Sequence, residues 1–453
     1  MARAATGPAG ADRERYLAEF ARLGKERPSF KRSWTFRVRQ DALSVFDEIG
    51  FPTLHDEEWR KTSVTPILRV PFRPQPASAT NGFTRQVIER YTFEPWDCTH
   101  MVFVNGHHAA GLSRLRPLPA GVVIEPLAAA LEKRRDEIEP HLARHAGDRK
   151  HAFAALNTAF MQDGAYIRVP GGVELEEPIH LLFISTSDSG PVVSYPRNLV
   201  VAGRGARASV VESYVGPHHD LYFTDAVTEI VAGESTAIDH YKLQRESEKA
   251  YHVAVVQGDL GRSARLGSWN ISLGGALVRN DLGALLGAEG GEVNLEGLYI
   301  TGGTQHVDNH TLIDHASPHC ASHELYKGVL DDRSRGVFDG TIIVRQDAQK
   351  TDAHQTNRNL LVSENALVDS TPRLQILADD VKCTHAATIG QIDEDQMFYL
   401  RSRAISQEAA RNLLIQAFVS EVLHTMRIGP LRAGLECLLF TRLRKGHGAG
   451  VES

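Results

Sequence analysis

A cysteine and a histidine stand two residues apart in the stretch VKCTHAATIG, residues 381–390. Alternate side chains of a β-strand share a face, so Cys383 and His385 are expected about 7 Å apart on one face. The two groups could ligate one soft or borderline metal ion, or the imidazole could lower the pKa of the thiol. Two ligands do not complete a metal site, which would need a second segment or another chain. Two ordinary polar residues on a strand are the alternative.

Metal-ligand residue types are also concentrated in QHVDNHTLIDHASPHCASHELYKG, residues 305–328. On a strand, His306, Asp308 and His310 share a face and could present two imidazoles and a carboxylate to a metal ion. His315 would point to the opposite face of the strand, and Pro318 interrupts the element soon afterwards. Polar residues that stack on neighbouring strands and bond to one another explain the segment with less strain. A metal-dependent enzyme is therefore kept as an alternative only.

Motifs for several other chemistries are absent from the sequence. It contains no G-x-x-x-x-G-K-[ST] loop, no G-x-G-x-x-G after a strand and no nucleophile elbow. We therefore expect no ATP site of the Walker type in this chain. The polar stretch AQKTDAHQTNRNLL, residues 348–361, indicates hydrogen-bonded ladders or an exposed face. A stand-alone solenoid enzyme, such as a polysaccharide-active one, would need paired carboxylates in a groove, and no such constellation stands out.

Composition favours a soluble cytoplasmic protein. The 453 residues include 50 lysines and arginines against 56 aspartates and glutamates, and the net charge of −6 argues against nucleic acid as the main partner. The four cysteines are far apart and form no C-x-x-C, which favours a reducing compartment. No apolar stretch of about 18 residues occurs, so no membrane span is expected.

Residues 1–150 read as short helices joined by loops. Tyr16, Phe20 and Leu23 follow a helical spacing and form one apolar face. The stretch MVFVNGHH alternates and turns at Asn105–Gly106, which indicates a short hairpin. This region is therefore expected to be mainly helical, with one hairpin.

Residues 151–400 change to short alternating strands that are rich in valine and isoleucine. A glycine followed by a small or apolar residue and then a large aliphatic recurs, with glycine spacings of 28, 28 and 29 residues. The glycines are Gly205, Gly233, Gly261 and Gly290. This period predicts a β-solenoid with glycines at its corners and one inward column of aliphatics. That column is expected to be Val210, Ile238, Leu266 and Leu295. A meander or barrel of similar hairpins is the alternative. An extra strand pair is expected between Gly290 and the strand GVFDGTIIV.

Residues 401–453 are helical again. Ser406 is a good N-cap, Ile405 could act as a hydrophobic staple, and Gly429–Pro430 separates two helices. One broad apolar face is predicted for the first helix, made of Ala410, Leu413, Leu414, Ala417, Phe418 and Val422. Two helices do not easily form a core alone, so they are expected to pack on the solenoid, on the N-terminal helices or on another protein.

Three long stretches carry a resemblance to a known family. They are ALNTAFMQDGAYIRVPGGVELEEPIHLLFI (155–184), ELYKGVLDDRSRGVFDGTIIVRQDAQKTDAHQTNRNLLVS (324–363) and DDVKCTHAATIGQIDEDQMFYLRSRAIS (379–406). Together they resemble the SufB/SufD family of iron–sulfur cluster assembly proteins, and more closely its SufD members. The position of a SufB cysteine that is central to assembly is Ala366 here, and His385 is flanked by Thr384 and Ala386 where SufB has acidic residues.

The resemblance implies a mainly β fold, a right-handed parallel β-helix (151–400) between N-terminal (1–150) and C-terminal (401–453) helical domains. It implies a non-catalytic scaffold subunit that assembles with SufB and two copies of the ABC-type ATPase SufC. A transient iron–sulfur cluster or iron is expected where the two β-helices meet, with His385 as the best ligand and Cys383 as a less certain one. SufC is expected to dock on the helical region of Ile405, Ala410, Leu413, Leu414, Ala417, Phe418 and Val422. A SufB-like direct scaffold is the alternative within the family, and the isolated chain could form a homodimer.

Overall fold

The computed structural model describes residues 8–26, 33–75, 82–93, 96, 98–146, 151–187 and 190–445. Its helices are α1 (Pro8–Glu26), α3 (Thr35–Ile49), the short 3₁₀ turn η1 (Glu57–Trp59), α4 (Thr65–Leu68), α5 (Arg85–Glu89), α6 (Leu127–Lys133), α7 (Arg135–Ile138), α8 (Ala152–Phe160), α9 (Glu394–Ser402), α10 (Gln407–His424) and α11 (Gly429–Lys445). The shorter strands are β1 (Arg73–Pro74), β2 (Thr99–Val104), β3 (His107–His108), β4 (Val123–Pro126), β5 (Ala165–Val169), β6 (Ile179–Ile184), β7 (Val192–Ser194) and β8 (Arg197–Ala202). The longer strands are β9 (Arg207–Val215), β10 (Tyr222–Ala232), β11 (Ala237–Arg245), β12 (Tyr251–Leu260), β13 (Arg265–Ser272), β14 (Leu277–Leu286), β15 (Glu292–Thr301), β16 (His306–His315), β17 (Ala321–Leu330), β18 (Arg335–Val344), β19 (Asp352–Leu361), β20 (Leu367–Ile376) and β21 (Lys382–Gln391).

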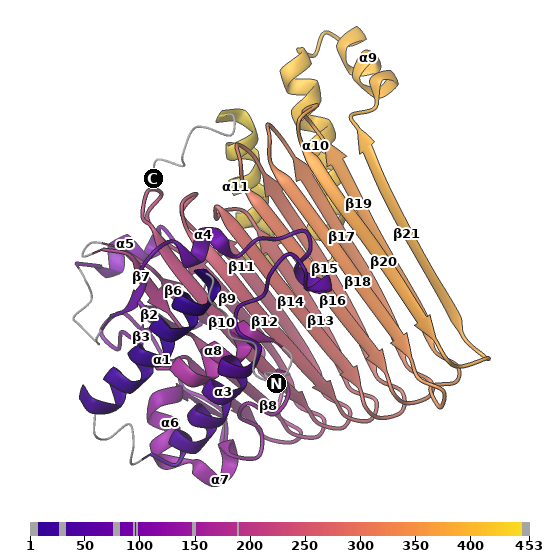
Figure 1. Ribbon diagram of the computed structural model, residues 1–453. Coiled ribbons are helices and arrows are strands. Elements are labelled where there is room, and N and C mark those ends of the chain that lie inside the picture. The colour runs from indigo at the N-terminus through magenta and orange to yellow at the C-terminus, as the bar shows by residue number, and fades with distance from the viewer. Residues whose placement is uncertain are drawn as a thin grey trace.

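Successive long strands alternate between two sheets. One sheet has the order β20-β18-β16-β14-β12-β10-β8-β5-β4, and the other has the order β21-β19-β17-β15-β13-β11-β9-β6-β2-β3. All pairs of long strands are parallel, which the alternating connection between two sheets requires. The predicted mainly β solenoid flanked by helices is therefore confirmed, and Figure 1 shows its strands in a row that extends beyond the N-terminal helices.

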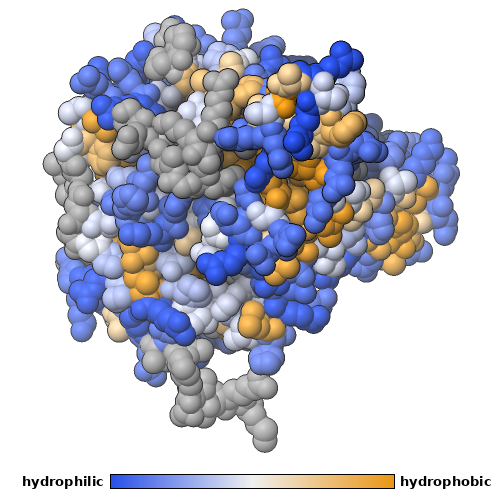
Figure 2. Space-filling model, turned by 90° about the horizontal axis from the view of Figure 1, so that it is seen from above, coloured by the Kyte–Doolittle hydropathy of each residue, from blue (hydrophilic) through white to orange (hydrophobic). Residues whose placement is uncertain are grey.

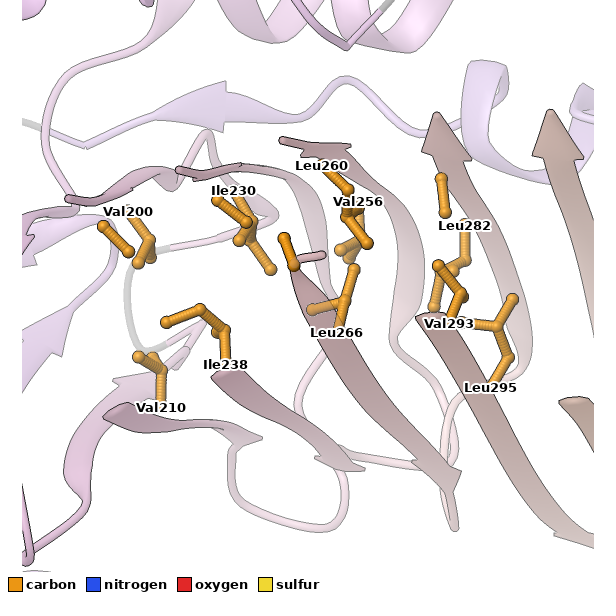
Figure 3. Packing of buried hydrophobic residues seen from close by; sticks show 14 of the residues in the cluster. Val200, Val210, Ile230, Ile238, Val256, Leu260, Leu266, Leu282, Val293 and Leu295 are labelled. Carbon is orange, nitrogen blue, oxygen red and sulfur yellow. The ribbon is translucent and has the colours of Figure 1, made fainter. Parts of the chain in front are cut away.

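The space between the two sheets is filled by inward side chains (the lumen). Small and branched aliphatic residues line it over most of its length, and Figure 3 shows ten labelled members facing one another from the two sheets. Alternation of the side chains sends every second residue into the lumen and the others to the outer faces. Lumen side chains of one sheet stack in columns, because each parallel strand lies in register with the next.

The predicted column is correct in its face but not in its register. Ile238 pairs with Ala208, not with Val210, and Leu266 pairs with Val293, not with Leu295. A shift of two residues keeps the same face, because the side-chain period of a strand is two. The expected extra strand pair is present as β16 and β17.

The corners explain why glycine recurs without a strict register. Gly205 and Gly290 have φ angles of 68° and 76°, whereas in the intervening turns Ser235 and Ser263 take the left-handed position. In those two turns the glycines, Gly233 and Gly261, precede the left-handed serine by two residues. A Cβ atom on Gly233 would lie 2.8 Å from the Ala202 carbonyl oxygen, so close backbone packing requires glycine.

Helices cover the two outer faces. An aromatic cluster from α1, α3 and α8 packs on Val193, Phe223, Val253 and Leu277 of the first sheet. The apolar face of α10 and α11 packs on the outer residues of β9 to β19 of the second sheet. Strands β2 and β4, from the first 150 residues, pair with β6 and β5, so the N-terminal region contributes to both sheets. The predicted hairpin is confirmed, with Asn105 and Gly106 at φ angles of 49° and 81°.

Candidate functional site

The last two strands form an uncovered end of the solenoid (the open end). β20 pairs only with β18 and β21 only with β19, so each is the edge strand of its sheet. Nearly all residues of β21 are exposed, whereas β11 and β13 are buried along almost their whole length. In Figure 1 both strands lie at the edge farthest from the N-terminal helices, with α9 above them.

Cys383 and His385 lie on the lumen side of β21. Cys383 is in register with Ala353, a fully buried lumen residue, and His385 is in register with Gln355. The thiol packs partly on the lumen core, and burial, aided by the nearby carboxylate of Asp352, raises its pKa. The two side chains therefore share one face, as the sequence predicts, and that face is the inner one.

Below His385 the same column continues into the protein. Gln355 and Glu324 are 1% and 3% exposed, and the Gln355 amide nitrogen Nε2 donates to Glu324 Oε2 over 2.7 Å. Burial raises the pKa of Glu324 to about 7. Sequence reasoning treated both residues only as parts of polar segments, because the register that places them under His385 cannot be counted before the corner lengths are known.

Large apolar side chains are exposed on the elements of the open end and on α9. The exposed ones on β20, the following corner and β21 are Leu367 (61%), Ile376 (40%), Leu377 (57%) and Ile389 (50%). Phe398 and Tyr399 of α9 are also exposed, at 74% and 58%. Seen from above in Figure 2, hydrophobic residues reach the surface on the side where the last strands lie. A cluster of this kind marks an interaction surface more often than an isolated exposed leucine does.

The neighbours of His385 on the other face of β21 are engaged differently. Thr384 Oγ1 lies 2.7 Å from His354 Nδ1, and the His354 ring stacks on His323 at 5.3 Å between centroids. His354 Nε2 lies 2.9 Å from Asp352. Both nitrogens of His354 thus have polar neighbours on the outer face, which holds the ring in place. Ala366 is buried in an apolar cluster with Tyr299 and Leu330 and offers no ligand.

His306, Asp308 and His310 do share a face of β16, but each of them already has a polar neighbour within the chain. Asp308 is buried and accepts from Arg279 Nη1 over 2.8 Å, with His310 Nε2 3.1 Å from its other oxygen. His306 Nε2 lies 2.9 Å from Thr62 Oγ1 of the N-terminal region. Arg279 lowers the pKa of Asp308 well below its usual range although burial opposes this. The segment joins the N-terminal region to the sheet, so the polar interpretation is favoured over a metal site.

A buried chain of hydrogen-bonding groups escaped the sequence analysis. Cys98 Sγ lies 3.3 Å from His100 Nε2, His100 Nδ1 lies 3.0 Å from His180 Nδ1, and His180 Nε2 lies 2.8 Å from Ser213 Oγ. The Trp96 ring stacks on His180 at 5.0 Å. The available signal was the tripeptide Cys-Thr-His, which occurs at 98–100 as well as at 383–385.

The C-terminal helices present a buried face that differs from the predicted one. Ala410 and Val422 pack inward with Ile415, Val419 and Leu423 against the second sheet. Of the other residues predicted to bind a partner, Leu413 and Ala417 are exposed, and Ile405, Leu414 and Phe418 are half-buried. A shallow groove between α10 and α11 contains Leu413 and Phe440 together with polar residues of α10.

Polar contacts fix α10 to the solenoid. The Lys327 ammonium, 3% exposed, donates to the Phe418 carbonyl oxygen over 2.8 Å and pairs with Glu421. Arg411 donates to Asp331 over 2.7 Å, and Trp269 Nε1 donates to Thr425 over 2.8 Å. These contacts join β13, β17 and the corner after β17 to α10 and to Thr425, the residue that follows it.

No complete metal centre is formed within the part of the chain described here. Among those residues, no three histidine, cysteine, aspartate or glutamate side chains are arranged to hold a metal ion. Cys383 and His385 remain an incomplete set on an exposed edge. None of the described helices is long and apolar enough to span a membrane.

Comparison with known proteins gives a family over nearly the whole chain. The SufBD core domain of the SUF system for FeS cluster assembly matches residues 183–418, and the SufBD N-terminal region matches residues 14–181. The iron–sulfur cluster assembly protein SufD of Escherichia coli is 30% identical over 413 residues, which cover 90% of this chain and 93% of that protein. An iron–sulfur cluster assembly SufBD family protein of Synechocystis is 33% identical over 405 residues, 88% of each chain. SufD of Bacillus subtilis is 24% identical over 438 residues, 95% of this chain and 98% of that protein.

Proposed function

Because the chain belongs to the SufBD family of iron–sulfur cluster assembly proteins, we propose that it is a non-catalytic scaffold subunit of an assembly complex. In this proposal a SufB-type solenoid packs on the open end, a SufC-type ATPase docks on the C-terminal helices, and a nascent cluster forms where the solenoids meet. The cluster is the cargo of the complex. His385 contributes one ligand and Cys383 is a second candidate.

The uncovered edge of β20 and β21 is the observation that carries the proposal. An edge strand exposes unpaired backbone N–H and C=O groups, and soluble proteins usually protect such edges by charge, by bulges or by a covering element. Here the edge is long and carries apolar side chains such as Leu367 and Ile389. A partner solenoid would cover both the backbone groups and this apolar surface.

The incompleteness of the ligand set agrees with a shared site. An imidazole and a thiol on one face suit iron and other soft or borderline metals, but a stable site needs further ligands. The edge position leaves the space beyond His385 open to another chain. Such a site would exist only in the complex.

Docking of the ATPase is assigned to the exposed surface of the C-terminal helices. Leu413, Ala417 and the groove at Phe440 are accessible there, whereas Ala410 and Val422 would act by holding α10 to the second sheet. The Lys327–Glu421 and Arg411–Asp331 pairs would carry a movement of α10 into β17 and its following corner, which β19 separates from β21.

The proposal is tested by co-expression with SufB-type and SufC-type subunits. We expect the wild-type chain to co-purify with both, and His385→Ala to preserve assembly while it lowers the yield of reconstituted cluster, read by absorbance and iron content. Full cluster yield from His385→Ala would remove the ligand from the proposal. Thr384→Ala is a matched control, since Thr384 is on the same strand but faces outward.

The docking assignment has its own test. Leu413→Glu should weaken binding of the SufC-type subunit and leave binding of the SufB-type subunit intact, because the groove and the open end are separate surfaces. Loss of both partners, or of neither, would contradict the assignment of two surfaces.

A further inference from the structure

The column under His385 contains a buried amide whose orientation is determined by its neighbour. His385, Gln355 and Glu324 occupy the same register position on β21, β19 and β17. Neighbouring strands are about 4.8 Å apart, so each side chain is in reach of the next one. A Cβ atom on Gly340 of the facing sheet would lie 2.3 Å from Gln355 Nε2. The glycine therefore leaves the room that the Gln355 amide occupies.

The oxygen of the Gln355 amide, Oε1, is buried without a hydrogen-bond partner within the described chain. Because Nε2 is engaged by Glu324 on β17, the amide oxygen is the group left free for a donor on the other side, that of β21. His385 is the register partner on that side. A buried acceptor left unpaired costs free energy, so a donor at this position would be stabilising.

We propose that Gln355 and Glu324 are positioning residues that decide which nitrogen of His385 offers its lone pair at the open end. This inference rests on the proposed role of His385 as a ligand. An ionised Glu324 can only accept, so it holds the NH₂ group of Gln355 toward itself and the amide oxygen toward His385. In this proposal the exposed imidazole turns so that one of its nitrogens donates its N–H to this oxygen. The other nitrogen carries the lone pair and faces the partner chain.

Protonation of Glu324 reverses this arrangement. A carboxylic acid donates its O–H, and the amide oxygen of Gln355 is then its acceptor after a half-turn of the amide. The NH₂ group now faces His385 and donates to the nitrogen beside it. A neutral imidazole has one donor and one acceptor nitrogen, so the outer nitrogen takes the hydrogen and loses its lone pair. His385 then cannot ligate a metal at the open end.

The switch falls close to neutral pH because Glu324 is buried. Burial raises the pKa of Glu324 to about 7, so its proton is gained or lost within the physiological range. The titratable groups around Glu324 are Tyr326 on β17, Glu296 on the outer face of β15, and His315, which pairs with Ser322. Burial lowers the pKa of His315 to about 4, so it stays neutral over this range. Thr311 of β16 and Gln355 of β19 hydrogen-bond to the Glu324 carboxyl, which lowers its pKa against the larger effect of burial, and neither side chain titrates.

The test uses the isolated full chain and diethyl pyrocarbonate, which acylates an imidazole nitrogen that has an accessible lone pair. The acylation rate of His385 is measured by peptide mass spectrometry from pH 6 to pH 8, relative to the exposed His219 in the same sample. Dividing the wild-type rate by the rate in Glu324→Gln removes every pH effect that the two proteins share. We expect this quotient to be about fivefold larger at pH 8 than at pH 6, the factor given by one hydrogen bond.

A double-mutant cycle separates positioning from general destabilisation. In the near-isosteric background Gln355→Met the amide is absent, so Glu324→Gln should no longer change the His385 rate at any pH. Glu324→Asp, whose shorter carboxyl cannot reach the amide, should behave like Glu324→Gln. Superimposable profiles for wild type and Glu324→Gln, or an unchanged effect in the Gln355→Met background, would overturn the inference. The measurement needs neither iron nor a partner, so it is independent of whether His385→Ala lowers cluster yield.

Discussion

The tripeptide Cys-Thr-His occurs twice in this chain, and the two copies lie at opposite ends of the same sheet. Cys98 directly precedes β2, near the first edge, and Cys383 is on β21, the last edge. At the first copy the thiol contacts the imidazole of the same tripeptide, and that imidazole contacts His180, with the Trp96 ring against both imidazoles. At the second copy His385 is exposed, and among the described residues it has no hydrogen-bond partner.

The difference shows that position in the stack, not spacing, decides what such a motif does. The first copy points to the outer face, where His180 and Ser213 of the neighbouring strands extend its hydrogen-bonding network within one chain. The second points into the lumen at a level where no further turn of the solenoid follows. A polar pair that is satisfied internally stabilises the fold, and a pair that is left open at an edge is available to another molecule. The predictions below test this contrast.

Removal of the buried imidazole should have the largest effect. His180→Ala deletes the stack with Trp96 and the contacts with His100 and Ser213, and leaves a cavity. We expect a loss of about 3 kcal/mol in the free energy of unfolding, measured by urea denaturation of the isolated chain at pH 7.5. His385→Ala should stay within about 0.5 kcal/mol of wild type, as exposed positions usually do. Equal losses from the two variants would contradict the contrast between the ends.

A charge on the open end should act on partner binding and not on folding. Ile389→Lys places an ammonium group in the apolar surface of β21, and we expect affinity for the SufB-type partner to fall at least about thirtyfold, the loss typical of a central interface residue. Leu115→Lys is a matched control, because both side chains are 50% exposed and Leu115 lies near the first edge. The stability of the isolated chain should not change in either variant. If the partner binds Ile389→Lys as tightly as it binds Leu115→Lys and the wild type, the interface lies elsewhere.

The first copy should also make stability depend on pH. Burial lowers the pKa of His180 well below 6.5, and His100 and Arg245 add to the effect. The unfolded chain then binds a proton below pH 6.5 that the folded chain does not bind, so the contribution is full above pH 6.5 and is lost as pH falls. We expect a loss of about 1 kcal/mol between pH 6.5 and pH 5.5, measured by urea unfolding. His180→Gln should flatten the curve by this amount; an unchanged curve would show that other groups cause it.

The solenoid could be predicted from the sequence because backbone constraints at its corners require particular residue types at a regular period. Gly233 recurs with its neighbours since a Cβ atom there would meet the preceding turn, and the Asn105–Gly106 turn needs two positive φ angles. The residues that stack in one lumen column could not be predicted, because corners of different length shift the strand register by two residues and leave the same side chains facing the lumen. Cys383 and His385 were placed on one face correctly for the same reason. Their exposure depends on which strand is last, and the 98–100 cluster depends on a contact with His180 that is 80 residues distant.

The smallest effect on stability is expected for Cys383, and it ranks the two candidate ligands. Cys383→Ala removes a half-buried thiol at the edge of the lumen core and should cost at most about 0.5 kcal/mol in urea unfolding, whereas Cys98→Ala should cost about 1–2 kcal/mol because Cys98 is fully buried against His100. Burial and Asp352 raise the pKa of the Cys383 thiol, so it stays protonated near neutral pH and must lose a proton before it can bind a metal. An imidazole with an outward lone pair needs no such step. Cluster yield should therefore fall further in His385→Ala than in Cys383→Ala, and the reverse order would make the thiolate the principal ligand of this chain.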